Sequence, residues 1–114
     1  MQKKILLVTN GCTEAWAVIE YAVGMAKLMQ ASFTLLGVVE KMDELHPVED
    51  IFSRATTLFQ EEGLVYDLQL VNGETEDILA KMDWDENTYL FVGTLGRSLF
   101  RHWLVGRSLR KITE

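Results

Sequence analysis

The sequence has few of the residues that stabilise a chain through covalent bonds or bound metals. The 114 residues include a single cysteine, so no disulfide can form within the chain. Proline also occurs only once. No set of cysteines and histidines has the spacing of zinc ligands. The apolar runs are short, and none approaches the roughly 20 residues that cross a membrane. We therefore expect no metal site and no membrane insertion, and a fold that depends on a hydrophobic core.

Basic residues are also scarce, since 11 lysines and arginines stand against 17 acids and give a net charge of −6. A general nucleic-acid binder needs a basic face, so we expect no nucleic-acid partner. Most of the acids lie between residues 40 and 86, where they fit a solvated helix face better than an acidic site. The chain starts without a signal-peptide pattern, which predicts a cytoplasmic protein.

The apolar and charged fractions, 48% and 25%, suit one globular domain over residues 1–114. Short apolar or alternating segments predict strands near residues 3–9, 33–39, 64–71 and 88–92. Helical spacing of apolar residues starts at Thr13, which we expect to be the N-cap, and again at Pro47, Thr75 and Arg97. Strands that alternate with helices in this way predict an α/β protein with an open parallel sheet and helices on both faces.

Two of the expected strand exits are rich in glycine. The first is Asn10-Gly11, and the second is Gly93-x-x-Gly96, followed after nine residues by Gly106-Arg107-Ser108. Glycines allow a ligand to approach the backbone closely, and the N–H groups of such loops bind anions. In parallel sheets, ligands bind beyond the carboxyl ends of strands where the winding reverses. The alternative is structural: Gly93 and Gly96 then only turn the chain out of a strand.

With these motifs the chain resembles the universal stress protein family, whose nucleotide-binding members carry Gly-x-x-Gly, nine residues and Gly-Ser/Thr. Further similarity lies in residues 4–11, 37–40 and 73–80, so the resemblance covers nearly the whole chain. It implies a Rossmann-like sheet in the strand order 3-2-1-4, with the fifth strand of the family missing. It also implies an adenine nucleotide (ATP, ADP or AMP) at the carboxyl ends of strands 1 and 4, with Mg²⁺ only if ATP is bound.

Carried over position by position, the resemblance implies a set of nucleotide-binding residues. Thr9 and Asn10 would border ribose and adenine, and Val38 would contact the base. The other members would form the floor of the site and hold the ribose and phosphates: Val92, Gly93, Gly96, Arg97, Gly106, Arg107 and Ser108. Two positions depart from the family pattern. Asn10 replaces an aspartate and keeps an acceptor oxygen, and Arg107 replaces a hydroxyl residue but offers a fork of phosphate donors.

The sequence gives little support for catalysis. No nucleophile–base pair, carboxylate pair or Walker lysine is visible, so we expect no catalytic residue and at most weak ATPase activity. Cys12 lies near an expected helix start that would lower its pKa, but the chain has no resolving cysteine for redox chemistry.

Two functions from different classes follow. The first is a small cytosolic stress-response or regulatory module that binds an adenine nucleotide. The second is a nucleotide-free, dimeric interaction protein of the same fold. In both we expect a homodimer, formed through the edge of the last strand, Tyr89 to Val92, and the C-terminal helix around Trp103. The alternative is that this helix folds back within one chain and covers the edge itself. Other protein partners stay unidentified.

Overall fold

A four-stranded parallel sheet forms the centre of the computed structural model, which describes residues 3–81 and 86–93. Its strand order is β3-β2-β1-β4, and every neighbouring pair is parallel. The strands are β1 (Lys4–Thr9), β2 (Ser32–Val39), β3 (Tyr66–Asn72) and β4 (Thr88–Gly93). This confirms the α/β fold class and the order 3-2-1-4. The expected absence of a fifth strand concerns residues outside the described part of the chain.

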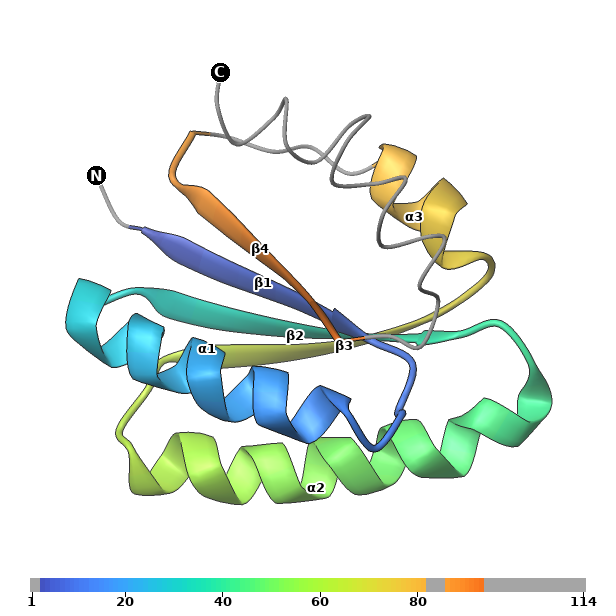
Figure 1. Ribbon diagram of the computed structural model, residues 1–114, viewed down its shortest axis with the longest axis horizontal. Coiled ribbons are helices and arrows are strands. Elements are labelled where there is room, and N and C mark those ends of the chain that lie inside the picture. The colour runs from blue at the N-terminus through green and yellow to red at the C-terminus, as the bar shows by residue number, and fades with distance from the viewer. Residues whose placement is uncertain (1–2, 82–85, 94–114) are drawn as a thin grey trace.

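Helices cover both faces of this sheet. The helices are α1 (Ala15–Met29), α2 (Leu45–Glu61) and α3 (Thr75–Lys81), and a short 3₁₀ helix, η1 (Met42–Glu44), precedes α2. α1 and α2 lie on one face, whereas α3 lies on the other (Figure 1). The connections through α1 and α2 therefore lead from β1 to β2 and on to β3 over one face of the sheet. The connection through α3 passes back over the other face and leads to β4, beside β1. The winding reverses between β1 and β4.

The core has two layers because β1 and β2 are buried on both faces. Ile5 and Leu7 of β1 pack into the cluster beneath α1 and α2, where the Phe33 and Phe59 rings lie 4.7 Å apart. Leu6 and Val8 point to the opposite side. On that side, Leu79 of α3 packs over them. The continuous apolar runs thus correspond to strands without a solvent face.

Loop interactions shift several boundaries away from the sequence-based prediction. Thr13 is not the N-cap of α1. Glu14 takes that place, and the Ala15 N–H donates to the carbonyl of Cys12 at 3.1 Å in the preceding turn. β3 begins two residues after Leu64, because the Leu64 N–H donates to the Phe59 carbonyl and completes the end of α2.

Pro47 is the third residue of α2, since the helix already begins at Leu45. A proline is tolerated there because N–H groups of the first turn have no acceptor within the helix. No helix among residues 3–81 and 86–93 is long and apolar enough to span a membrane.

Candidate functional site

The exits of three strands lie side by side at the carboxyl edge of the sheet. Thr9, the last residue of β1, pairs with Gly37 of β2 on one side and with Gly93 of β4 on the other. Asn10 and Gly11 follow at once. The structure therefore brings the two glycine-rich exits together at the point where the winding reverses, which is the usual position of a ligand in such a sheet.

The loop after β1 is held by its own polar side chains and by a close packing contact. The Gly11 N–H donates to Thr9 Oγ1 at 3.0 Å, and the Cys12 N–H donates to Asn10 Oδ1 at 3.2 Å. Gly11 has a φ of +85°, and a Cβ there would lie 2.6 Å from the backbone nitrogen of Val48. Only glycine fits this position without strain, because the loop rests directly on the first turn of α2.

The side chain of Cys12 connects the exits of β1 and β4. Its thiol donates to the carbonyl of Gly93 at 3.4 Å, and its side chain is buried. Burial raises the pKa of the thiol, the Glu14 carboxylate raises it further, and the Ala15 N–H acts in the opposite direction. The expectation that a helix start lowers this pKa is therefore wrong, because the loss of water around the sulfur outweighs the effect of the helix.

Two glutamates organise the exit of β2. Glu44 Oε1 accepts the N–H groups of Glu40 and Lys41 at 2.8 and 3.1 Å. Glu40 Oε2 in turn accepts the N–H of Thr75, the first residue of α3, at 2.7 Å. These carboxylates bind backbone donors that would otherwise lack partners, so they connect β2, η1 and α3 around the carboxyl edge.

A hollow of about 270 Å³ opens beside these loops. It is lined by residues that follow β1 and β2, namely Asn10, Gly11, Cys12, Lys41, Asp43, Glu44 and Pro47. The volume lies just below the range of small-molecule pockets, so it suits one part of a ligand, such as a heterocycle or a sugar. Its charged groups are of both signs. Such a lining matches hydroxyl and N–H groups better than a polyanion.

The expected site residues differ in what they offer to a ligand. Asn10 lines the hollow. The side chains of Thr9 and Val38 are fully buried and lie on opposite faces of the sheet, so they pack inside the carboxyl edge. A Cβ on Gly93 would lie 3.2 Å from Ala15, and Val92 precedes it half-buried in β4. Five expected residues lie outside the described part of the chain: Gly96, Arg97, Gly106, Arg107 and Ser108.

Sequence reasoning missed the β2 side of the hollow. Lys41, Asp43 and Glu44 follow β2 just as Asn10 follows β1, and this shared position was the available signal. The charge pattern of residues 40–86 instead attributes Asp43 and Glu44, with the other acids, to a solvated helix face. Among residues 3–81 and 86–93, no group of three acidic, histidine or cysteine side chains can hold a metal ion.

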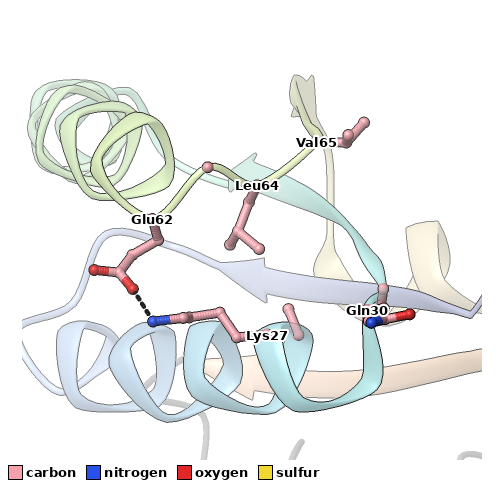
Figure 2. A pocket seen from close by; sticks show the side chains of 8 residues that line it. Lys27, Gln30, Glu62, Leu64 and Val65 are labelled. Atoms are coloured by element: carbon pink, nitrogen blue, oxygen red, sulfur yellow. Dashed lines mark hydrogen bonds and ion pairs between the residues drawn. The ribbon is translucent and has the colours of Figure 1, made fainter.

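A second hollow, of about 340 Å³, lies at the opposite edge of the sheet, between the C-terminal ends of α1 and α2. Figure 2 shows Lys27 and Glu62 joined across it by an ion pair. Both charges are thus neutralised by each other, and none of the expected site residues lines this hollow. We assign no ligand to it.

Solved structures provide the comparison with known proteins, because no protein family model and no curated protein matches the sequence. A universal stress protein family member from Burkholderia pseudomallei aligns with a TM-score of 0.70 at 16% identity, over 95% of this chain and 88% of that one. A universal stress protein in complex with cAMP aligns at 0.59 and 18% identity, over 97% and 87%. The universal stress protein from Archaeoglobus fulgidus aligns at 0.57 and 16% identity, over 99% and 91%.

The strand order and the reversal at β1 and β4 define an open, doubly wound α/β fold of the Rossmann-like class. Within that class, the chain has the fold of the universal stress proteins. The resemblance indicated by the sequence is thereby confirmed at the level of the fold.

Proposed function

We propose that this chain is a cytoplasmic regulatory module of the universal stress protein type, and that it binds an adenine nucleotide at the carboxyl ends of β1 and β4. One observation carries the proposal: the hollow beside Asn10 lies at the exits of β1 and β2, and β1 is one of the two strands between which the winding of the sheet reverses. A structure of the same fold holds cAMP, which supports the choice of an adenine nucleotide.

The lining of the hollow supports the base and ribose as its occupants. Asn10 Oδ1 already accepts the Cys12 N–H, so its amide group offers two donors to the acceptor nitrogens of a base. Asp43 offers a carboxylate, the group that commonly accepts ribose hydroxyls in doubly wound folds. We propose that the phosphates then lie beyond Gly93, held by Gly96, Arg97, Gly106, Arg107 and Ser108, with Mg²⁺ present only when ATP is bound.

The test has two parts. Purified protein is denatured and any released nucleotide is identified by mass spectrometry, and calorimetry then measures the binding of ATP, ADP, AMP and cAMP. We expect Asn10→Ala to weaken binding about tenfold, the effect of losing a partly buried hydrogen-bond partner. Met42→Ala is the matched control, because Met42 stands between two lining residues but is 80% exposed. No released nucleotide and no heat with any of the four would overturn the proposal.

That negative result would favour the second function, a nucleotide-free interaction protein. A specific observation favours it as well: the Thr9 hydroxyl, Asn10 Oδ1 and the Cys12 thiol all bind backbone groups of the site itself. In that case the polar groups at this edge serve to fix the loops. Asn10→Ala would then lower the thermal midpoint without changing any ligand affinity.

A further inference from the structure

The outer face of α1 differs from that of its neighbour α2. From Glu49 onward, every exposed residue of α2 is polar or charged, as expected for a helix that faces water. α1 has six exposed positions, and only Glu20 and Lys27 among them are charged. The others are Ala17, Tyr21, Gly24 and Leu28. A helix that is apolar on its outer side as well as its inner side is normally covered on both.

These four residues form one continuous stripe. They are spaced by four, three and four positions, so at 100° per residue they fall within an arc of about 60° on the helix. Tyr21 is 65% and Leu28 is 82% exposed. Val18 and Met25 flank the stripe on the side of β4, where Tyr21 also contacts the Phe91 ring. Glu20 and Lys27 flank it on the side of α2, where Lys27 pairs with Glu62.

We infer that the stripe is a homodimer interface in which α1 packs antiparallel against α1 of a second copy. A two-fold axis between residues 22 and 23 places Tyr21 on Gly24 of the partner subunit. The same axis places Leu28 on Ala17 of the partner subunit. Each large side chain thus faces a small one, and the pattern is complementary to itself, as a two-fold interface requires.

The flanking residues match in the same register. In an antiparallel helix pair with this spacing, Glu20 lies beside Lys27 of the partner subunit, which pairs opposite charges at two symmetric places. On the other flank, Val18 lies beside Met25 of the partner subunit. An unrelated partner would have to supply this pattern independently. A second copy of the chain supplies it automatically.

The contact is small, because a helix of 15 residues is about 22 Å long. Interfaces of this size are usually weak, so we expect dissociation at micromolar concentrations. The inference does not depend on nucleotide binding. It also places the dimer on a different surface from the strand edge and C-terminal helix that the sequence suggested.

Light scattering after gel filtration at about 100 µM protein, well above the expected dissociation constant, tests the interface. We expect the mass of a dimer for the unchanged protein. Leu28→Glu should raise the dissociation constant at least tenfold and give a monomer with an unchanged circular dichroism spectrum, because Leu28 is exposed in the single chain. Met42→Glu adds the same charge at an equally exposed site and should stay dimeric. A monomeric unchanged protein, or a Leu28→Glu variant that remains dimeric, overturns the inference.

Crosslinking tests the register. In the double variant Ala17→Cys, Leu28→Cys, the two introduced thiols of one chain are about 16 Å apart along the helix, too far to bond with each other, and the native Cys12 is buried. Antiparallel pairing brings each beside the other type in the partner, so mild oxidation should yield a covalent dimer. Neither single variant should crosslink. Crosslinking of the Ala17→Cys variant alone would indicate parallel packing and contradict the proposed arrangement.

Discussion

Cys12 shows how burial decides the chemistry of a single residue at the carboxyl edge. The thiol lies between two strand exits, donates to the carbonyl of Gly93, and has a raised pKa because it has lost water. A raised pKa means that the folded protein keeps the proton after the unfolded chain has released it. The stability from Cys12 is therefore complete below the ordinary thiol pKa of about 8.5, and is lost as the pH rises through the higher pKa of the folded state.

This gives the first prediction. The free energy of unfolding should fall more steeply above about pH 8.5 in the unchanged protein than in Cys12→Ser, whose hydroxyl does not titrate there. Urea unfolding followed by tryptophan fluorescence between pH 7 and 10 measures both curves. Parallel curves would show that the thiol titrates as freely in the folded protein as in the unfolded chain.

Glu40 is a second single residue that stabilises the carboxyl edge, because one of its carboxylate oxygens accepts the first N–H of α3. Glu40→Ala should lower the free energy of unfolding by about 1 kcal/mol, the usual effect of losing a helix cap. Glu40→Gln keeps an acceptor oxygen and should lower it by less. Asp50→Ala removes an exposed carboxylate from α2 and provides the control, with a change expected within about 0.5 kcal/mol in chemical denaturation. Equal effects of Glu40→Ala and Asp50→Ala would contradict the capping role.

At the scale of the elements, the loop after β1 and the start of α2 form one packed unit around Gly11. Gly11→Ala should destabilise the fold by roughly 2–4 kcal/mol, since a positive φ and a clash with backbone atoms act together. Gly63→Ala separates the two effects. Gly63 has a φ of +68° but open space around it, so only the strain of about 1 kcal/mol remains. Thermal melts of the two variants measure the difference, and similar midpoints would show that the loop moves aside without penalty.

The same elements show what a sequence can and cannot predict. The strands were recognised because residues such as Ile5 to Val8 are apolar without interruption, and burial on both faces demands that composition. The pairing of Thr9 with Gly93 requires strands 1 and 4 to be neighbours, an order that only the family resemblance implied. The Cys12–Gly93 and Glu40–Thr75 hydrogen bonds could not be predicted, because each joins segments far apart in sequence through a close approach that only packing determines.

At the scale of the whole molecule, charge limits where a second copy can dock. The chain carries a net charge of −6, and many acids are exposed on α2 and on the loops after β2. Two copies that met through those surfaces would repel each other. The stripe on α1 contains no charged residue, and its one acidic flank, Glu20, is expected to meet a lysine.

Reversing the charge of Glu20 gives the fourth prediction. Glu20→Lys should weaken the dimer about twofold to tenfold, because each of two exposed opposite-charge pairs becomes a like-charge pair. Adding Lys27→Glu in the same chain restores opposite charges across the interface, but it also places a second carboxylate beside Glu62, so the double variant should recover part of the affinity. Sedimentation equilibrium measures both dissociation constants. Failure of the double variant to recover would mean that the flanking charges do not face each other.

The position of β1 between β2 and β4 has a consequence for how the chain folds. Lys4 pairs with Ser32 after one short crossover, but its other neighbour, Thr88, lies far later in the sequence. Contacts between distant residues form slowly, because a long loop must close before they gain any energy. During synthesis, β1 to β3 with α1 and α2 can assemble first, while one edge of β1 stays unpaired until the ribosome has released β4. We expect this interval to be the time at which the chain is most prone to aggregate.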